Sequence, residues 1–333
     1  MSDPWIFERV VGVFDQLLLS PASRLFYGYL ACAAVIALLP YWLYTARAKR
    51  SVGGFVRYLA PREVYAHRSF RVDVMLVTFN GIALPALASV YALSIVEWSG
   101  LVATGLTAWL PEPVPPAEWP LAGKLLAGLA LFALDDFARF LWHRACHGSS
   151  FLWRFHSVHH SAEHLNPLTT WRFHPFDTIF ENMCSIVLVG TVIGIVQAVG
   201  GVSAINFHQT VVWVLYVQLF NVLGGNLRHT HIWVSWGPWF SHVFSSPAQH
   251  QIHHSSDARH RDKNFTLCLS VWDWMFGTLY VPKGKEDLKF GLSGEANHRS
   301  LCDALLRPLR WQPGIARHHD GFANTQTLQD RHG

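Results

Sequence analysis

The sequence contains few charged residues. Asp, Glu, Lys and Arg make up only 14% of its 333 residues, whereas soluble domains average about 25%. Hydrophobic residues reach 51%, and several apolar runs are about twenty residues long. Two soluble domains would fit the length but not this composition. The scarcity of charge therefore favours an integral membrane protein.

Other features are missing as well. The net charge of +4 is small and no Lys/Arg-rich stripe occurs, which argues against nucleic acid as a partner. The five cysteines are odd in number and form no C-x-x-C pair, so no disulfide framework is expected. Neither a G-x-G-x-x-G fingerprint nor a C-x-x-C-H haem motif is present. The chain therefore has no recognisable redox cofactor site of these kinds.

Long apolar runs predict membrane-spanning helices at residues 25–44, 72–96 and 121–142, because about twenty apolar residues cross the hydrocarbon core. Two further apolar runs, separated by two glycines, predict a membrane hairpin over residues 179–223. Whether residues 97–110 span the membrane or re-enter it stays open. The expected fold is an all-α integral membrane protein, a bundle of about four to five transmembrane helices with a cytoplasmic histidine-rich helical cap.

The distribution of basic residues predicts the orientation. Residues 47–71 carry seven Lys/Arg and a single Glu, so the positive-inside rule places this segment in the cytoplasm. Two further crossings then bring the histidine-rich region, which begins at His143, to the same side. An Arg to Lys ratio of 20 to 6 is common in GC-rich genomes, and we expect a bacterial inner membrane.

Twenty histidines are the unusual feature of the composition, and many of them fall into three short boxes. The boxes are His143-x3-His147, His156-x2-His159-His160 and His250-x2-His253-His254. Positions i, i+3 and i+4 lie on one side of a helix, so each box can present several imidazoles to a metal. Eight imidazoles exceed the needs of one four-coordinate ion, which predicts two metals. Imidazole suits zinc, iron, copper and nickel, so the ligand type does not identify the metal.

The boxes and the residues around them resemble a known family. The segments are DFARFLWHRACH from Asp136, LWRFHSVHHSAEHLNPLTTWRFHPFD from Leu152, SPAQHQIHHSSDARHRDKNF from Ser246 and VWDWMFGTLY from Val271. Together they resemble the fatty acid hydroxylase and sterol desaturase superfamily, which consists of integral membrane non-haem diiron enzymes. The resemblance covers residues 134–282, less than half of the chain.

The resemblance implies a set of metal ligands. The eight box histidines carry over as iron ligands, namely His143, His147, His156, His159, His160, His250, His253 and His254. His174 and His229 are implied as two further ligands, although the choice between His229 and His231 stays open. No catalytic side chain beyond the metal centre is implied.

Acidic residues near the boxes are candidates for orienting the ligands, because metal-bound histidines usually donate their second ring nitrogen to a carboxylate or carbonyl. Asp136 lies seven residues before His143, two helical turns along the same face, and is the first candidate. Asp177, Glu181, Asp257 and Asp273 are further candidates of the same kind.

Composition divides off an N-terminal membrane region (1–142) and a polar tail (283–333) that we expect to be flexible. By resemblance, residues 143–282 between them form a fatty-acid-hydroxylase-like diiron region. The implied activity is hydroxylation of an unactivated C–H bond in a bilayer lipid, with O2 as co-substrate and two Fe. The implied electron donor is a cytochrome b5-like protein or a ferredoxin with its reductase. Fatty acyl chains, including those of ornithine lipids, and sterol-like or hopanoid-like molecules are candidate substrates.

Three alternatives accompany this interpretation. A desaturase would use the same diiron site, because the outcome depends on how the substrate carbons lie relative to the oxidant. A membrane zinc hydrolase is disfavoured because the H-E-x-x-H motif is absent. A non-enzymatic haem or metal carrier would pair histidines across the spans, whereas these histidines cluster outside the apolar runs.

Overall fold

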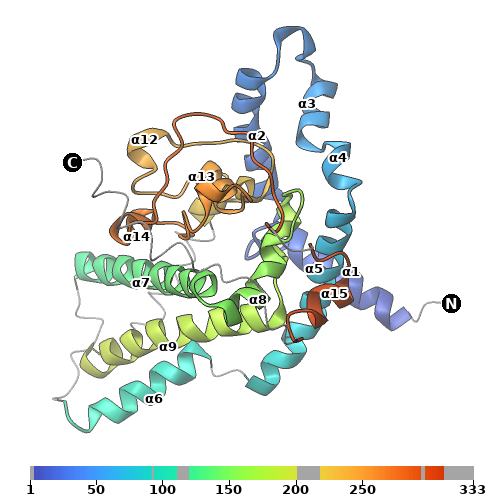
Figure 1. The fold of residues 1–333 in the computed structure, drawn as a ribbon. Coiled ribbons are helices and arrows are strands. Elements are labelled where there is room, and N and C mark those ends of the chain that lie inside the picture. Colours follow the sequence, from blue (N-terminus) through green and yellow to red (C-terminus); the bar gives the residue numbers. More distant parts are fainter. Residues whose placement is uncertain (1–3, 92–93, 111–119, 201–217, 294–296, 311–333) are drawn as a thin grey trace, which may run out of the picture.

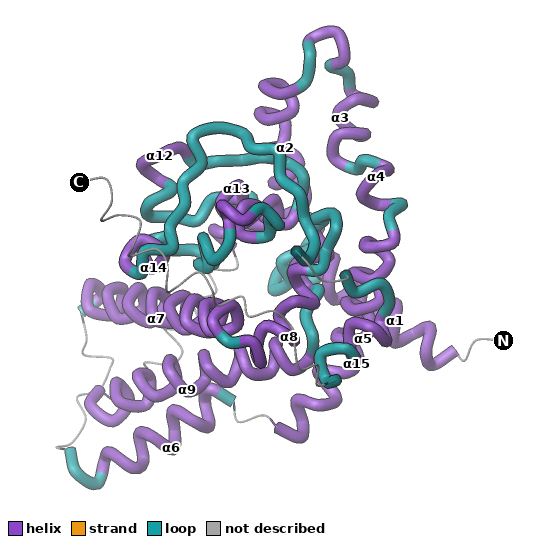
Figure 2. Tube along the Cα trace, viewed as in Figure 1, coloured by secondary structure: helices purple, strands orange, loops and turns teal. Residues whose placement is uncertain are grey.

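The computed structural model describes residues 4–91, 94–110, 120–200, 218–293 and 297–310 (Figure 1). Over these residues the regular secondary structure is helical, and the only bridge between extended segments joins Ser255 and Phe290 (Figure 2). The expectation of an all-α protein is therefore confirmed for the described part of the chain.

The N-terminal region consists of helices that lead toward the centre of the molecule. They are α1 (Pro4–Leu19), α2 (Tyr27–Tyr44), η1 (Arg47–Lys49), α3 (Val52–Leu59), α4 (Arg62–Tyr65) and α5 (Arg68–Tyr91). The middle of the chain forms α6 (Ile95–Thr107), α7 (Leu121–Gly148), α8 (Ser150–His160), η3 (Pro167–Trp171) and α9 (Pro175–Gly200). Short helices follow: α11 (Phe220–Val222), η5 (Gly225–His229), α12 (Gly237–Phe240), α13 (Pro247–His253), η6 (Ala258–His260), α14 (Val271–Met275) and α15 (Leu301–Leu306).

Two of the described helices, α2 and α9, are long and apolar enough to cross a membrane. They coincide with the predicted span at residues 25–44 and with the first arm of the predicted hairpin. Helices α5 and α7 overlap the other predicted spans, but they carry charged residues such as Asp73 and Asp136 and do not meet the same criterion. The second arm of the hairpin lies largely outside the described residues.

The segment whose membrane role stayed open, residues 97–110, is mostly helical and packs along α9 (Figure 1). Helix α6 has 13 residues, so it is about 20 Å long and too short to cross the roughly 30 Å hydrocarbon core alone. Gly194 of α9 permits the close approach, because a Cβ atom there would lie 2.6 Å from the carbonyl oxygen of Ser99. Leu131 of α7 packs on the same part of α9, so α6, α9 and α7 form one layer.

The short C-terminal helices cover the ends of α7 and α8 (Figure 1). Ala248 and Ile252 of α13 form a small core with Trp233. Helix α15 packs its buried Ala304 against Val158 of α8. The tail predicted to be flexible from residue 283 contains a helix, α15, whose apolar residues complete the core between α5 and α8. The prediction is therefore wrong for this helix, whereas residues 311–333 lie outside the described residues.

Candidate metal centre

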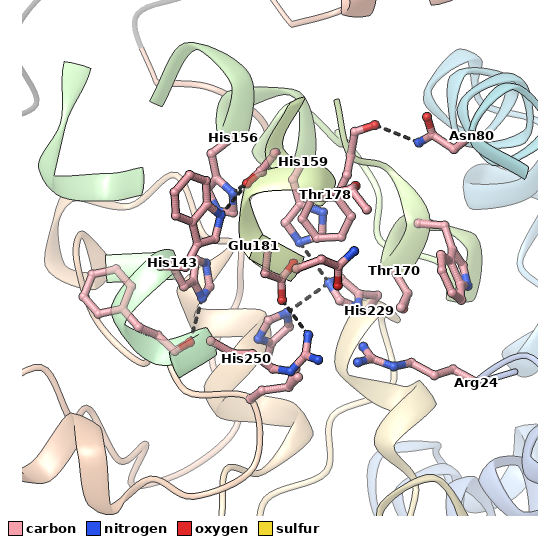
Figure 3. Close-up of a pocket in the computed structure, with 18 of the residues that line it drawn as sticks. Arg24, Asn80, His143, His156, His159, Thr170, Thr178, Glu181, His229 and His250 are labelled. Carbon is pink, nitrogen blue, oxygen red and sulfur yellow. Dashed lines mark hydrogen bonds and ion pairs between the residues drawn. The ribbon is translucent and has the colours of Figure 1, made fainter. Parts of the chain in front are cut away.

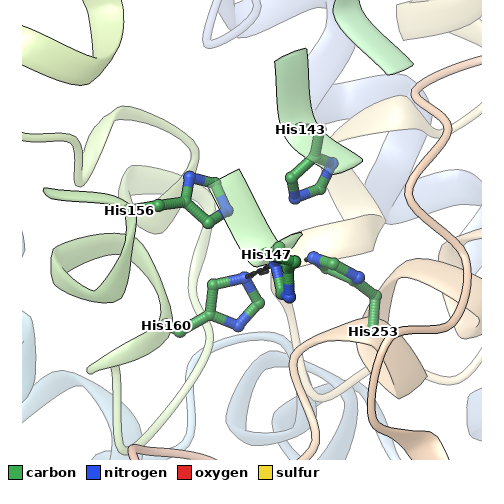
Figure 4. Close-up of side chains that lie close together, drawn as sticks. All are labelled: His143, His147, His156, His160 and His253. Carbon is green, nitrogen blue, oxygen red and sulfur yellow. Dashed lines mark hydrogen bonds between the residues drawn. The ribbon is translucent and has the colours of Figure 1, made fainter. Parts of the chain in front are cut away.

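Nine histidines converge in two groups, which we call nests. The five-histidine nest contains His143, His147, His156, His160 and His253 (Figure 4). The four-histidine nest contains His159, His229, His250 and His254. Within each nest, one ring nitrogen of every histidine lies within 4.8 Å of the corresponding nitrogens of the others. All eight box histidines are thus brought together, and His229 joins them.

Helix geometry explains how the second and third boxes each contribute to both nests. In α8, His156 and His160 are four residues apart and point into the five-histidine nest, whereas His159 points into the other. In α13, His250 and its C-cap neighbour His254 repeat this arrangement for the four-histidine nest. Because successive helical residues are rotated by about 100°, an adjacent histidine pair such as His159–His160 serves two different centres.

Helix caps fix the starts of α8 and α13, the helices that carry the second and third boxes. Ser149 ends α7 and caps α8 by accepting a hydrogen bond from the backbone N–H of Leu152, so the first and second boxes lie on consecutive helices with a tight corner between them. Helix α13 starts with a reciprocal capping box between Ser246 and Gln249, with Pro247 in its first turn. Such caps satisfy the free N–H groups at a helix start, so they fix where the third box begins.

The Nε2 atoms point inward in both nests. In the five-histidine nest, Nε2 of His160 lies 3.1 Å from Nε2 of His253 and 3.2 Å from Nε2 of His147. In the four-histidine nest, Nε2 of His229 lies 2.9 Å from that of His250 and 3.1 Å from that of His254. Several imidazole nitrogens therefore meet at one point in each nest.

The Nδ1 atoms of His143 and His253 point outward, and their partners determine the tautomer. Nδ1 of His143 lies 2.6 Å from the carbonyl oxygen of Phe265, and Nδ1 of His253 lies 2.8 Å from that of Lys263. A carbonyl only accepts hydrogen bonds, so each of these Nδ1 atoms carries the proton and each Nε2 carries a lone pair. Converging lone pairs repel one another unless a cation lies between them. The donor set therefore fits one metal ion per nest.

Burial keeps these rings neutral. Desolvation lowers the pKa of His159, His160, His250 and His254 well below the ordinary value, and neighbouring imidazoles lower it further. Burial likewise lowers the pKa of His253 to about 3. Neutral imidazole is the form that binds a metal, so the nests are ready to bind metal at neutral pH.

Asp177 is a carboxylate that orients a nest histidine, and Asp262 lies 3.4 Å from Nδ1 of a second one, His147. Its Oδ2 lies 2.8 Å from Nδ1 of His156, and its Oδ1 accepts a 2.8 Å hydrogen bond from the indole N–H of Trp142. The residue is 2% exposed and lies in the first turn of α9. In the four-histidine nest, the Thr170 hydroxyl lies 2.9 Å from Nδ1 of His229. It stands behind His229 as Asp177 stands behind His156.

Asp136 was the first candidate for a carboxylate that orients a histidine, but it has a different structural role. Its carboxylate is fully buried and accepts 2.9 Å hydrogen bonds from the backbone N–H groups of Cys268 and Leu269, with a third from the indole of Trp272. None of its hydrogen bonds goes to a histidine. The expectation fails because the face of α7 two turns before His143 meets the loop after the third box. Asp136 therefore anchors that loop to α7.

The remaining acidic candidates have separate partners. Asp273 accepts hydrogen bonds from the N–H groups of Phe265 and Thr266, and so fixes the loop whose carbonyl meets His143. Glu181 forms an ion pair with Arg139, and Asp257 forms one with Arg259. None of these three carboxylates contacts a nest histidine in the described structure.

His174 and His231 lie outside both nests. Nδ1 of His174 accepts a hydrogen bond from the backbone N–H of Phe176, and its Nε2 lies 3.1 Å from the carbonyl oxygen of Leu305. Both ring nitrogens are therefore used by the backbone, and we leave His174 out of the proposed ligand set. Nε2 of His231 lies 2.6 Å from the carbonyl oxygen of Tyr58. Between His229 and His231, the structure places only His229 in a nest.

Sequence reasoning missed Arg172, which is completely buried. Its guanidinium donates to the carbonyl oxygen of Val158 at 2.9 Å, to the hydroxyl of Ser161 at 2.9 Å and to Asp73 at 2.7 Å. It therefore fixes the C-terminal end of α8, where His159 and His160 lie. The sequence feature that could have indicated Arg172 is Asp73, an acidic residue inside an apolar run. Such a residue requires a partner of opposite charge.

The nests are accessible from two sides. A pocket of about 290 Å³, here called the α9-side pocket, is lined by five nest histidines together with residues of α7 and α9 (Figure 3). These five are His143, His156, His159, His229 and His250. The other four line a separate opening of only about 40 Å³, here called the small polar opening; they are His147, His160, His253 and His254. Both nests contribute to each side, so a molecule in the α9-side pocket contacts both.

A third hollow, the apolar cavity, lies next to the α9-side pocket. It has a volume of about 650 Å³ and is lined mainly by Leu, Phe and Trp side chains of α7, α11 and α12. Arg228 and Cys268 line the apolar cavity, whereas their sequence neighbours His229 and Leu267 line the α9-side pocket. The two hollows therefore share a wall formed by these two short segments.

Residues 128–278 match the family model described as fatty acid hydroxylase. The chain is similar to the ornithine lipid hydroxylase OlsE of Rhizobium tropici, with 28% identity over 183 residues that cover 54% of this chain and 49% of that protein. It is also similar to the alkylglycerol monooxygenase of Caenorhabditis elegans, with 28% identity over 164 residues, 49% of this chain and 29% of that protein.

A third relative is the very-long-chain aldehyde decarbonylase GL1-5 of Oryza sativa subsp. indica, with 26% identity over 165 residues, 48% of this chain and 24% of that protein. The chain spans about half or less of the length of these curated relatives. No solved structure matches it. The matched region contains all nine nest histidines.

Proposed function

Because residues 128–278 form a fatty acid hydroxylase domain, we propose that the chain is a membrane-bound oxygenase that hydroxylates an unactivated C–H bond of a lipid. The observation that carries the proposal is the pair of histidine nests, whose Nε2 atoms converge on two points. The five-histidine nest would hold one Fe and the four-histidine nest the other. Bound there, two irons supply the activation of O2 and the oxidising power that side chains lack.

The chain's own residues would bind and aim the substrate. The α9-side pocket contacts histidines of both nests, so a carbon placed in it lies beside both proposed metal positions. Its wall includes the Arg139–Glu181 ion pair and the side chain of Asn80, which can hydrogen-bond a polar group near the reacting carbon. The pocket is therefore suited to hold the part of a lipid where chain and polar head meet.

The apolar cavity favours a substrate that is a lipid with a hydrocarbon chain. Its almost wholly apolar lining and volume of about 650 Å³ suit an acyl or alkyl chain. Two relatives are named for lipid hydroxylation or monooxygenation, of ornithine lipids and alkylglycerols respectively. We propose an acyl- or alkyl-chain lipid as substrate, with an ornithine lipid as the first compound to test.

Hydroxylation needs electrons from outside the chain. The reaction R–H + O2 + 2 e⁻ + 2 H⁺ gives R–OH and H2O, and we propose that a cytochrome b5-like protein or a ferredoxin with its reductase supplies the two electrons. We further propose that the protein lies in a bacterial inner membrane with its metal centre on the cytoplasmic side. The apolar helices α2 and α9 and the basic segment 47–71 support this placement.

Metal content and product together test the proposal. Detergent-purified protein should contain about two Fe per chain by elemental mass spectrometry, one in each histidine nest. His159→Ala should lower the metal content, whereas the matched control His174→Ala should retain it, because both ring nitrogens of His174 bind the backbone. One metal or none in the wild type would contradict the dinuclear site. If both sites contain zinc, the metal content supports the dinuclear site only, and the lipid product decides whether the chain is an oxygenase.

The product distinguishes hydroxylation from its alternatives. Cells that express the chain should accumulate lipids heavier by 16 mass units, and His159→Ala should abolish them. Lipids lighter by two mass units would instead identify a desaturase. Lipid cleavage without consumption of O2 would identify a hydrolase and overturn the proposal.

A further inference from the structure

One wall of the α9-side pocket comes from the N-terminal region of the chain. Arg24 and Asn80 line this wall, and both lie outside residues 128–278, which contain the nest histidines and match the family model. Arg24 belongs to the connection between α1 and α2, and Asn80 belongs to α5. The pocket therefore joins the proposed metal centre to polar side chains from outside the matched region.

The backbone around Arg24 is fixed, so its side chain has a defined direction. The neighbouring Leu25 is 2% exposed, and the hydroxyl of Tyr29 donates to the carbonyl oxygen of Pro21 at 2.9 Å. Figure 3 shows the Arg24 side chain reaching into the pocket toward His229. A positive charge is therefore held in the same pocket as the proposed metal ligands.

The two carboxylates that line the pocket each have a partner of their own. Asp177 lies 2.8 Å from Nδ1 of His156, and Glu181 forms an ion pair with Arg139 at 2.9 Å. These contacts reduce the repulsion that an entering anion would meet. A guanidinium such as that of Arg24 binds a carboxylate or a phosphate through two parallel N–H bonds. The wall is therefore suited to an anionic group.

Asn80 adds a hydrogen-bond acceptor to this wall. It is 6% exposed, and its Nδ2 donates to the carbonyl oxygen of Phe173 at 2.9 Å. Because a carbonyl oxygen only accepts, this bond fixes which end of the side-chain amide is the oxygen. In the described structure, Oδ1 of Asn80 is buried and accepts no hydrogen bond. A buried acceptor without a donor is costly, so a ligand with an N–H or O–H group would complete the pocket.

We propose that Arg24 and Asn80 form a head-group subsite for a lipid whose head carries an anionic group next to an N–H or O–H donor. This proposal rests on the proposed function, because it assigns the polar end of the same substrate. Arg24 would bind the carboxylate or phosphate, and Oδ1 of Asn80 would accept from the neighbouring amide or hydroxyl. The carbons beside the head would then lie next to the histidines of the pocket, so the subsite would determine which carbon reacts.

Amphiphiles with the same dodecanoyl chain test the two contacts separately. N-Dodecanoylglycine carries both a carboxylate and an amide N–H, its methyl ester lacks the charge, and N-dodecanoylsarcosine lacks the N–H. Dodecanoyl lysophosphatidate carries a phosphate and a hydroxyl instead. Their dissociation constants are measured by equilibrium dialysis against the detergent-purified, full-length, iron-loaded protein.

The variants are Arg24→Gln, the conservative Arg24→Lys and Asn80→Leu. The control is Arg57→Gln on α3, because Arg57 is exposed and does not line the pocket. We expect the wild type to bind N-dodecanoylglycine about tenfold more tightly than either its ester or the sarcosine compound, the usual effect of one hydrogen bond to a charged or buried group. Arg24→Gln should remove the preference over the ester, and Arg24→Lys should retain part of it. Asn80→Leu should remove only the preference over the sarcosine compound, and Arg57→Gln should change neither.

Asn80→Leu also removes the hydrogen bond to Phe173, whose ring stacks on that of His159. Iron content is therefore measured for every variant. The ratios of dissociation constants within one variant are compared, because a general loss of structure weakens the binding of all these compounds alike. A change in one ratio alone thus reports a contact with the head group.

The subsite would be overturned if the wild type bound neither anionic compound, if it bound the free acid and the ester equally, or if Arg24→Gln kept the preference for the acid. Equal binding of the glycine and sarcosine compounds would overturn the role of Asn80. The tighter of the two anionic compounds identifies the group that Arg24 binds as a carboxylate or a phosphate.

Hydroxylation of the bound lipid is measured in the same preparations by mass spectrometry, with a ferredoxin and its reductase as electron source. Selective binding without a hydroxylated product would contradict the proposed function and leave the subsite standing. A hydroxylated product without selectivity that depends on Arg24 would contradict the subsite alone. The two failures are therefore distinguishable.

Discussion

At the scale of single residues, the orientation of His156 depends on Asp177. The carboxylate fixes the ring through Nδ1 and is itself held by the indole N–H of Trp142. We expect Asp177→Asn to weaken metal binding about 10- to 100-fold, the usual effect of removing a carboxylate behind a metal-bound histidine. Metal retention during titration with a chelator measures this loss.

The control for this variant is Glu181→Gln, one helical turn further along α9. Glu181 pairs with Arg139 and does not contact a histidine, so its replacement should leave metal retention unchanged. Equal chelator sensitivity of wild type and Asp177→Asn would show that the carboxylate does not support the site.

The histidine boxes could be predicted from sequence because helical spacing alone places i and i+4 on one face. The same rule explains why His159 and His160 serve different nests. It says nothing about His229, which lies in the short 3₁₀ segment η5, or about His174, which follows an irregular turn. Their positions depend on contacts with distant parts of the chain, such as Thr170 and Leu305.

At the scale of helices, α6 and α9 approach closely at two small residues spaced by four. A Cβ atom at Gly194 would lie 2.6 Å from Val102, and one at Gly190 would lie 2.9 Å from Trp98. We expect Gly194→Leu to destabilise the protein by about 1–3 kcal/mol, because the added side chain forces the helices apart. Thermal unfolding in detergent should show a lower Tm.

Gly105 of α6 provides a matched control, since a Cβ atom there would meet nothing within 4 Å. Gly105→Leu should leave the Tm unchanged or raise it slightly, because leucine has a higher helix propensity than glycine. A similar Tm for both variants would mean that α6 does not pack on Gly194.

Arg172 joins elements that are distant in sequence. It links α5 through Asp73, the end of α8 through Val158, and the C-terminal segment through the carbonyl oxygen of His298. We expect Arg172→Leu to destabilise the fold by about 3–5 kcal/mol, because it leaves a buried carboxylate without its cation.

The comparison for Arg172 is the exposed pair of Arg259 with Asp257. Arg259→Ala should cost at most about 1 kcal/mol, since solvent screens exposed ion pairs. Denaturant unfolding in detergent gives both values, and equal stability of Arg172→Leu and the wild type would contradict the structural role of the buried pair.

The helical elements themselves were largely predictable from sequence, whereas their surroundings were not. Hydrophobicity identified the segments that became α2, α5, α7 and the described part of the hairpin, because a long apolar run favours a helix. It could not show that α7 buries Asp136 against the loop at Cys268, since that contact joins residues more than one hundred positions apart. Helix α15 in the tail was not predicted for a related reason, because a six-residue helix is too short for a clear periodic pattern.

At the scale of the whole molecule, the side of the membrane that holds the metal centre can be tested with a natural cysteine. Of the five cysteines, Cys302 is exposed, whereas Cys146 and Cys268 are buried. Cys302 lies in α15, whose Ala304 packs on Val158 between the histidines of the second box. A reagent that reaches Cys302 therefore reports the side on which the nests lie.

We expect a membrane-impermeant maleimide to label Cys302 in inverted inner-membrane vesicles but not in intact cells, because we propose that the basic segment 47–71 and the metal centre face the cytoplasm. Cys302→Ser should abolish the labelling, since Cys32 and Cys184 lie half-buried in the apolar helices α2 and α9. Labelling in intact cells would place the metal centre on the outer face. A cytoplasmic electron donor could then not reach the proposed metal centre, so this one measurement also constrains the proposed donor.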